Sequence, residues 1–201
     1  GTLGAIVRDR VTNDRLILSN NHVIANSNNA DIGDPIIQPG GADGGQTDDD
    51  IIAHLERFCP IQFSVDVGDC DLANTFADIG NGLARLLGSK HRLQTIQADP
   101  AASNLVDAAV ARPINDADVL DEIIEIGEVS GTLDANLGMN VRKSGRTTEF
   151  TTGEVTVLDA TVNVSYGIGR NARFDGQIVT GPMSQGGDSG SLLVAGDSLQ
   201  A

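Results

Sequence analysis

A serine enclosed by glycines near the end of the chain carries the strongest chemical signal in the sequence. Ser189 lies in the hexapeptide GGDSGS at residues 186–191. Glycines permit a tight turn that a substrate can approach closely, and consecutive amides in such a turn can point one way and bind an anion. The segment therefore predicts a nucleophile, Ser189, beside an oxyanion hole made by the N–H groups of Gly187 and Ser189.

A serine hydroxyl needs an adjacent base to act as a nucleophile, and the chain has three histidines. His22 directly follows an apolar segment predicted as a strand, within the sequence LILSNNHV. His54 lies inside another predicted strand, and His91 lies in a basic segment after a predicted helix. We interpret His54 and His91 as structural or solvated side chains. His22 is the candidate general base.

An imidazole base in turn needs a carboxylate that fixes its tautomer. Among the 28 acidic residues, Asp107 stands out because it interrupts an apolar segment, NLVDAAVA at residues 104–111. A carboxylate in such a setting is costly unless it has a partner. Asp107 is therefore the candidate orienting acid, and the chain order His22, Asp107, Ser189 is one that the triad chemistry uses.

The elements that must position these residues are predicted to be mostly strands. Short β-like segments separated by Gly-rich turns favour an all-β barrel or sandwich over a parallel α/β sheet. Residues 27–50 are predicted as a loop because Asn, Asp and Gly dominate there. The predicted strands are 2–7, 15–19, 51–55, 61–67, 104–111, 140–143, 153–159, 161–166, 176–179 and 191–194.

One segment departs from the β pattern. Apolar residues recur at three- and four-residue steps through residues 71–88, which predicts an amphipathic helix packed on the side of a sheet. Residues 113–119 have the composition of a linker. We therefore predict two lobes, an N-terminal lobe over residues 1–113 that carries the helix and a C-terminal lobe over residues 114–201.

Composition limits the partners of the chain. Thirteen Lys and Arg against 28 Asp and Glu in 201 residues give a net charge of −15, which repels phosphate backbones and anionic lipid. We expect no nucleic-acid partner and no membrane partner, and no apolar stretch is long enough for a spanning helix. The charge is compatible with basic substrates or with a salty habitat. Sequence does not fix the compartment, although secretion is favoured over the cytoplasm.

Two cysteines, Cys59 and Cys70, are too few for a disulfide scaffold or a zinc site. They could form one bridge across a short loop or remain two reduced thiols. No metal and no cofactor is expected for the chemistry of a serine, a histidine and an aspartate.

Several segments together resemble the trypsin/chymotrypsin-like serine peptidases, and within them a bacterial group related to the plant narrow-leaf proteins. The resemblance runs from one end of the chain to the other. It rests on GTLGAIVRD at 1–9, LSNNHVIAN at 18–26, GDPIIQPG at 33–40, NLVDAAVARP at 104–113, VRKSGRTTEFTTGEV at 141–155 and GDSGSLLV at 187–194.

This resemblance implies a chymotrypsin-like fold of two six-stranded antiparallel β-barrels with the site between them. It implies a serine endopeptidase that hydrolyses protein or peptide substrates through an acyl-enzyme intermediate. The roles that it implies are His22 as general base, Asp107 as its orienting acid, Ser189 as nucleophile, and the amides of Gly187 and Ser189 as the oxyanion hole. Met183 would line the floor of the first specificity pocket, or would fill a gap in the second barrel.

Two departures from the family pattern concern the nucleophile's surroundings. Glu149 stands where relatives carry glycine in a turn, and because a glutamate is strained at positive φ, that turn is expected to differ. In relatives activated by cleavage, a new N-terminal amine pairs with the aspartate before the nucleophile. Only 20 residues separate Gly1 from His22, so we expect Asp188 to find another cation or amide partner.

The family has further strands after the nucleophile's strand, whereas this sequence stops at Ala201. The second barrel is therefore expected to be incomplete as written, and to be completed by a further C-terminal segment or a neighbouring chain. Two alternatives to an active peptidase remain open at this point. One is an inactive binding or scaffold module on the same fold, and the other is one fragment of a self-processing assembly.

Overall fold

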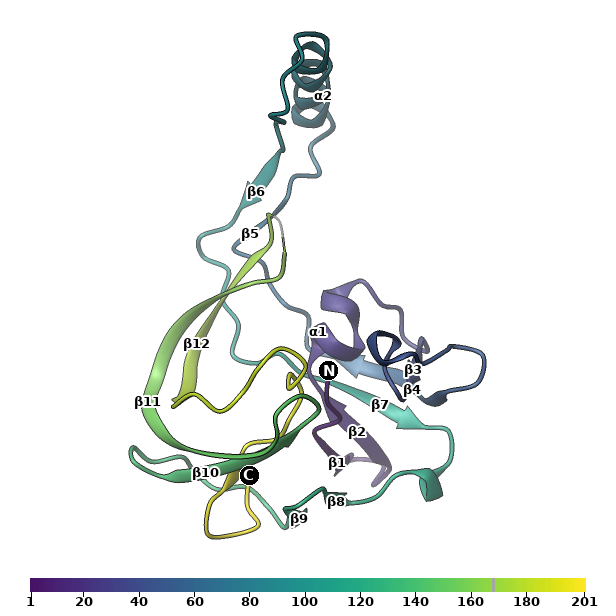
Figure 1. Cartoon of the computed structure of the whole chain (residues 1–201), viewed down its shortest axis with the longest axis vertical. Coiled ribbons are helices and arrows are strands. Elements are labelled where there is room, and N and C mark those ends of the chain that lie inside the picture. The colour runs from purple at the N-terminus through teal and green to yellow at the C-terminus, as the bar shows by residue number, and fades with distance from the viewer. Residues whose placement is uncertain (168) are drawn as a thin grey trace. The chain divides into compact units, whose positions relative to one another are not determined.

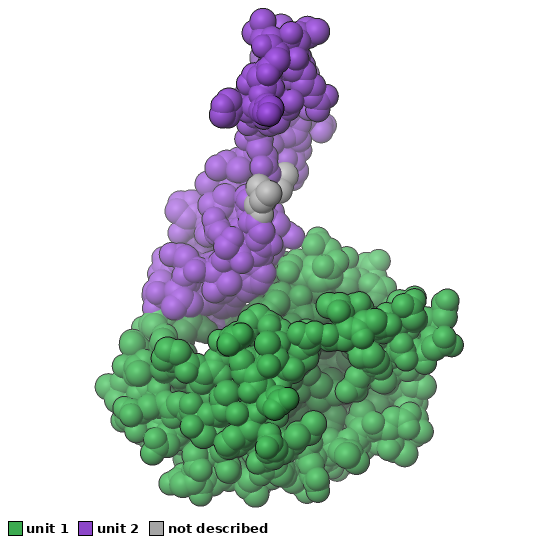
Figure 2. Space-filling model, viewed as in Figure 1, with its two compact units in different colours: residues 1–61, 106–160, 176–201 green, residues 62–105, 161–175 purple. Residues whose placement is uncertain are grey.

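The computed structural model describes residues 1–167 and 169–201 of the chain. These residues form two compact units (Figure 2). Unit 1 comprises residues 1–61, 106–160 and 176–201, and unit 2 comprises residues 62–105 and 161–175. The units do not coincide with the two predicted lobes, and the lobe boundary at residue 113 stays a prediction.

Unit 1 contains a five-stranded antiparallel sheet in the order β1-β2-β7-β4-β3 (Figure 1). The strands predicted at residues 2–7 and 15–19 are present as β1 and β2 and pair antiparallel, with Ala5 opposite Leu18. The strands are β1 (Ala5–Arg8), β2 (Arg15–Ser19), β3 (Pro35–Ile37), β4 (Ile51–Phe58) and β7 (Ala109–Pro113). Short helices lie between them: α1 (Asn21–Ile24) and the 3-10 helices η1 (Asn26–Asn28), η2 (Gly41–Asp43) and η3 (Asp116–Asp118).

Small and aliphatic side chains form the core of this sheet. Ile17, Ala53 and Ala111 share one buried cluster, and Leu55 packs with Ala109 in a second. Small residues on neighbouring strands leave room for the aliphatic side chains to pack closely. The sheet thereby holds the end of β2 and the start of β7 side by side, where Ser19 pairs with Ala109.

Unit 1 also contains a second set of strands, in the order β13-β10-β11-β12. The separately predicted strands 153–159 and 161–166 form one continuous strand, β11, which runs into unit 2 as β12 does. Val141, Val155 and Met183 form the core here. The strands are β10 (Asn140–Gly145), β11 (Glu149–Ser165), β12 (Asn171–Thr180) and β13 (Val194–Ala195). A separate two-stranded sheet consists of β8 (Glu122–Ile123) and β9 (Gly127–Glu128).

Unit 2 contains β5 (Val65–Val67), β6 (Ile96–Ala98) and the predicted helix, α2 (Asp71–Leu86). β5 pairs with β6 on one side and meets β12 through Asn171 on the other. The helix prediction is confirmed, including its end before Gly88, which has φ +72°. The expectation that α2 packs on a sheet is wrong, because no residue of α2 is buried.

The chain is thus mostly β with one long helix, as predicted. The sheets are open: among residues 1–167 and 169–201, neither strand order returns to its first strand. Closed six-stranded barrels are therefore not formed by the described part of the chain. Within the same residues, no helix has the length and apolar character that crossing a membrane requires.

Candidate active site

His22 and Asp107 lie in direct contact in unit 1. β2 ends at Ser19, and the chain turns at once into the single-turn helix α1, which carries His22. The His22 Nδ1 atom is 2.5 Å from Asp107 Oδ2, and the His22 amide donates to Asp107 Oδ1 at 3.2 Å. The side chains are 33% and 13% exposed. Since a carboxylate only accepts, this contact places the proton of the neutral imidazole on Nδ1 and leaves Nε2 as the basic nitrogen.

Asp107 does not lie within a strand, which corrects the sequence prediction. Strand β7 begins at Ala109, and the preceding Leu105 and Val106 are 77% and 48% exposed. The apolar residues before Asp107 were therefore misleading as a strand signal. The backbone is held instead by Asn20, whose side-chain amide donates to the Asp107 carbonyl at 2.6 Å.

Asn21 is a further positioning residue that the sequence analysis did not identify. It is fully buried, and its side-chain amide donates to the Cys59 carbonyl at 2.8 Å and to Asn28 Oδ1 at 2.7 Å. The Asn28 amide donates back to Asn21 Oδ1 at 3.0 Å. This closed set of bonds ties α1 to β4. Its sequence signal was the pair of asparagines directly before His22.

Ser189 lies on the turn that follows β12, and Thr2 connects that turn to the strand leading to His22. The Thr2 amide donates to the Ser189 carbonyl at 2.7 Å, and Thr2 Oγ1 donates to the Gly187 carbonyl at 2.9 Å. Ser19 Oγ, three residues before His22, donates to the Thr2 carbonyl at 2.8 Å. The structure therefore brings the segments of His22, Asp107 and Ser189 together in one unit.

The glycines around Ser189 are required by the backbone. Gly187 has φ +103° and Gly190 has φ +99°, which side chains disfavour. A Cβ on Gly187 would collide with Thr147 Oγ1, and a Cβ on Gly190 would collide with the Thr2 carbonyl. The backbone of this turn therefore depends on glycine at both positions, and the use of the Gly187 and Ser189 amides as an oxyanion hole stays a prediction.

Asp188, directly before Ser189, is a buried carboxylate at the centre of a hydrogen-bond network. It accepts from the amides of Gln185, Thr147 and Thr148 at 2.9, 2.8 and 3.1 Å, and from Thr148 Oγ1 at 2.7 Å. Burial alone would raise the pKa of Asp188. The Thr148 hydroxyl and the three amides outweigh burial and hold this pKa well below its usual range.

The cation that meets Asp188 is Lys143, a residue that the sequence analysis did not assign. Its Nζ atom is 3.3 Å from Asp188 Oδ2, and the two side chains are 3% and 1% exposed. This ion pair meets the expectation that Asp188 has a partner other than a new N-terminal amine. The strand pattern could have indicated that Lys143 is buried. Residues two apart in a strand face the same side, so Lys143 faces the same side as Val141, which lies in the hydrophobic core.

Glu149 adopts the left-handed conformation that its glycine-bearing relatives suggest. Its φ is +53°, so a glutamate occupies a conformation that favours glycine, and a difference from the relatives' turn stays a prediction. Lys143 Nζ also donates to the Glu149 carbonyl at 3.3 Å, and the β10–β11 hairpin pairs Gly145 with Glu149. The tight hairpin outweighs the preference of a glutamate for negative φ.

The remaining predicted residues lie apart from this chemistry. Met183 is 8% exposed and packs with Val141 and Val155, as a core residue does, and its role as a pocket floor stays a prediction. Cys59 and Cys70 are free, exposed thiols, so this structure holds no bridge between them. His54 Nδ1 is 2.9 Å from the Gly33 carbonyl, and His91 is exposed.

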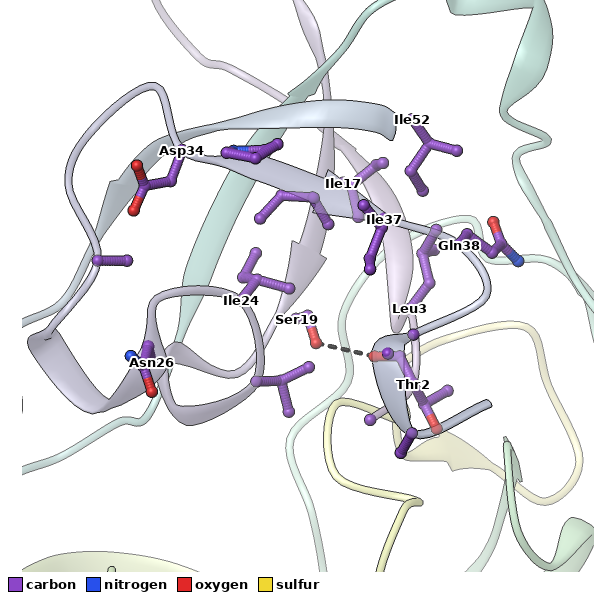
Figure 3. Close-up of a pocket in the computed structure, with 18 of the residues that line it drawn as sticks. Thr2, Leu3, Ile17, Ser19, Ile24, Asn26, Asp34, Ile37, Gln38 and Ile52 are labelled. Carbon is purple, nitrogen blue, oxygen red and sulfur yellow. Dashed lines mark hydrogen bonds between the residues drawn. The ribbon is translucent and has the colours of Figure 1, made fainter. Parts of the chain in front are cut away.

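A cavity of about 480 Å³ adjoins the Thr2–Ser19 hydrogen bond in unit 1 (Figure 3). Its apolar lining includes Ile17, Ile24 and Ile52, and its polar lining includes the carboxylates Asp34 and Asp43. Val23, the residue after His22, also lines it. The cavity therefore reaches the neighbourhood of the candidate base, with acidic groups among its polar residues.

Two bacterial proteases share part of this sequence. A stretch of 65 residues, 32% of this chain, is 49% identical to Streptogrisin-D of Streptomyces griseus, and a stretch of 69 residues, 34% of the chain, is 38% identical to Serine protease 1 of Streptomyces fradiae. The matches cover 16% and 18% of those proteins, so the chain spans less than a fifth of the curated relatives it matches. No protein-family model matches the chain.

Solved structures extend the likeness to nearly the whole fold. Nocardiopsis protease (NAPase) matches 98% of this chain over 72% of its own, with a TM-score of 0.52 and 17% identity. Thermobifida fusca protease A matches 98% over 71%, with a TM-score of 0.51 and 15% identity. A glutamic acid specific serine protease matches 96% over 72%, with a TM-score of 0.52 and 17% identity.

Part of the sequence is thus similar to bacterial serine proteases, and the fold is similar to that of trypsin/chymotrypsin-like serine proteases. Its predicted fold class, all-β and chymotrypsin-like, is confirmed by these structural neighbours. The narrower resemblance to the plant narrow-leaf group stays a prediction. One of the neighbours is described as specific for glutamic acid, so likeness to these structures does not by itself give a cleavage preference.

Proposed function

We propose that this chymotrypsin-like homologue is a serine endopeptidase that cleaves protein or peptide substrates through an acyl-enzyme. The observation that carries the proposal is the contact of 2.5 Å between His22 Nδ1 and Asp107 Oδ2. It leaves His22 Nε2 as a base in the same unit as the glycine-enclosed Ser189 turn. A scaffold without catalysis would have no need for this pairing.

In the acylation half, Ser189 Oγ attacks the carbonyl carbon of the scissile peptide bond and passes its proton to His22 Nε2. Asp107 keeps the imidazole in the required tautomer and stabilises the imidazolium that forms. His22 then gives the proton to the leaving amine. The C–N bond breaks, and the acyl group remains as an ester on Ser189.

In the deacylation half, water attacks the ester carbon while His22 accepts one of its protons. The ester bond to Ser189 breaks, and Ser189 Oγ takes the proton back from His22 as the carboxylic acid leaves. Both tetrahedral intermediates carry an oxyanion, which the Gly187 and Ser189 amides would stabilise. One such donor is typically worth about 3–4 kcal/mol of barrier.

The buried pair of Lys143 and Asp188 supports the turn on which these amides lie. Because Asp188 directly precedes Ser189, its four hydrogen bonds and one ion pair fix the backbone at the nucleophile. The ammonium group belongs to the folded chain itself. The site therefore needs no cleavage to supply a cation to Asp188.

Two features near the site bear on its cleavage preference, the residue Met183 and the cavity beside Val23. Met183 gives no charged group for an Arg or Lys side chain, and its packing against Val141 and Val155 supports a structural role, so a trypsin-like preference is not part of the proposal. The cavity beside Val23 combines isoleucines with Asp34 and Asp43. Peptide libraries that vary aliphatic and basic residues on both sides of the cleaved bond would map the preference.

Labelling with a fluorophosphonate probe tests the proposal directly. We expect the chain to be labelled at neutral pH, and we expect Ser189→Ala and His22→Ala to lose the label. Ser184→Ala is the matched control, because Ser184 is exposed and lies five residues before Ser189. A folded chain without Ser189-dependent labelling would support the scaffold alternative instead. An intact mass that includes a co-purifying C-terminal peptide would point to the self-processing assembly.

A further inference from the structure

Helix α2 presents a row of large apolar side chains to solvent. Each of them is more than half exposed, between 57% and 84%. Such a continuous apolar face on one element of a soluble protein marks an interaction surface. The row consists of Leu72, Phe76, Ile79, Leu83 and Leu86.

The rest of unit 2 covers a different side of the helix. The segment after α2 returns along it, and Asn81 holds this segment by two hydrogen bonds to the Leu93 backbone, at 2.9 and 2.7 Å. A Cβ on Gly80 would approach Leu93 Cδ1 to 2.7 Å, so the segment after α2 packs closely against the helix at this point. The intramolecular contacts of α2 are thus made by the Gly80–Asn81 side, and the apolar row remains open.

The spacing of the row has the pattern of a two-helix seam. Its members follow one another at steps of four, three, four and three residues, which is the alternation of a and d positions in a coiled coil. A seam of this kind needs a second helix with the same pattern to fill its holes. α2 of another copy of the chain provides one.

Charges along unit 2 select the direction of pairing. Acidic residues lie at and before the start of the helix and in its first half, and basic residues lie at and after its end. Antiparallel pairing sets the acidic half of one helix against the basic half of the other and also opposes the helix dipoles favourably, whereas parallel pairing would set like charges together. The residues are Asp69, Asp71, Asp78, Arg85, Lys90 and Arg92.

We propose that α2 pairs antiparallel with α2 of a second copy in a two-fold symmetric dimer. Centred on Ile79, this arrangement puts Asp71 of one copy within about 3 Å, along the axis, of the level of Arg85 of the other copy. Asp71 and Arg85 are two heptads apart and share one flank of the helix. Both residues occupy the outer c position of the heptad, so their opposite charges attract across the pair at long range and do not form direct ion pairs.

The size of the seam sets the strength of the dimer. Sixteen residues span about 24 Å, and one pair of such helices buries less than the roughly 1,200–2,000 Å² of a standard stable interface. We therefore expect a reversible dimer with a dissociation constant on the order of micromolar. The active-site residues lie in unit 1, so the dimer is independent of the proposed catalysis.

Sedimentation velocity of the full chain from about 1 to 200 μM tests the proposal. We expect a concentration-dependent shift from monomer to dimer, and we expect Ile79→Asp with Leu83→Asp to stay monomeric throughout. Val11→Asp is the control, because Val11 is an apolar residue that is 93% exposed outside the row. Circular dichroism checks that the α2 variant keeps its helix. This check is needed because α2 has no buried residue that would hold the helix in place.

Charge variants test the direction. Arg85→Glu should weaken the dimer roughly twofold because two long-range attractions become repulsive, and adding Asp71→Lys should restore part of the loss. A chain that is monomeric at every concentration would overturn the proposal. So would a dimer that the Ile79→Asp, Leu83→Asp variant leaves intact, or binding of the row to phosphatidylcholine vesicles in place of a second copy.

Discussion

Replacing Lys143 by methionine would test whether the buried pair behind Ser189 holds the candidate site together. The substitution keeps a long unbranched side chain and removes the positive charge. It leaves Asp188 buried, with a side chain 1% exposed, and without its cation. The hydrogen bonds to Asp188 from Thr147, Thr148 and Gln185 remain.

The magnitude follows from the distance and the burial. Two unit charges 3.3 Å apart attract by about 5 kcal/mol at an effective dielectric constant of 20, and removal of one partner of a buried pair typically costs about 3–5 kcal/mol. The four remaining hydrogen bonds still stabilise the Asp188 carboxylate. We therefore expect Lys143→Met to lower the free energy of unfolding by about 3 kcal/mol.

Urea unfolding of wild type, Lys143→Met, Asp188→Asn and the double variant measures this effect. The two substitutions should show a coupling energy of about 2 kcal/mol, since each removes the other's partner. Labelling of Ser189 by a fluorophosphonate should fall in Lys143→Met at a temperature where it remains folded. A loss below about 0.5 kcal/mol together with additive effects would refute the role given to the ion pair.

Three further predictions concern single residues. Glu149→Gly should raise the free energy of unfolding by about 0.5–1 kcal/mol in urea titrations, because glycine tolerates φ +53° and the gain exceeds its entropy cost; no change would mean that the hairpin is not strained. Asp107→Asn should lower kcat about 10⁴-fold on a peptide substrate while the unfolding midpoint stays close to wild type, and an unchanged kcat would remove Asp107 from the triad. The pKa of Asp188 is lowered in the fold, so its ionised form adds stability above the unfolded pKa near 4, and this stability is lost as the pH falls further. Unfolding measured between pH 6 and pH 2 should therefore show a steeper loss for wild type than for Asp188→Asn, and parallel curves would contradict this.

Short-range patterns in the sequence predicted the elements well where one physical signal dominated. The four- and three-residue steps of apolar residues predicted α2, and the short apolar segment in residues 15–19 predicted β2. The signal failed at residues 104–108, where apolar composition suggested a strand but Leu105 is 77% exposed. Composition alone could not tell an apolar loop from a strand, because burial is decided by partners distant in the sequence.

The candidate triad could be proposed from residue types and chain order, whereas its supporting residues could not. His22 and Asp107 are 85 positions apart, and their contact depends on the pairing of β2 with β7. Lys143 and Asp188 meet only when the hairpin of β10 and β11 lies against the nucleophile turn. A single lysine in a strand is usually exposed to solvent, so the sequence alone does not indicate that Lys143 is buried or which carboxylate it pairs with.

Thr2 holds the two candidate catalytic segments, the nucleophile turn and the strand before His22, in a fixed position relative to each other. Through its amide, hydroxyl and carbonyl groups it bonds to Ser189, Gly187 and Ser19, and its hydroxyl accepts from the Arg146 amide at 3.0 Å. These four bonds join the nucleophile turn, the strand before His22 and the hairpin that carries Lys143. A single residue three positions before β1 therefore couples the position of the candidate base to that of the candidate nucleophile. These bonds also depend on the glycines at positions 187 and 190. A side chain at either position would collide with Thr147 or Thr2 and would move the turn away from these residues.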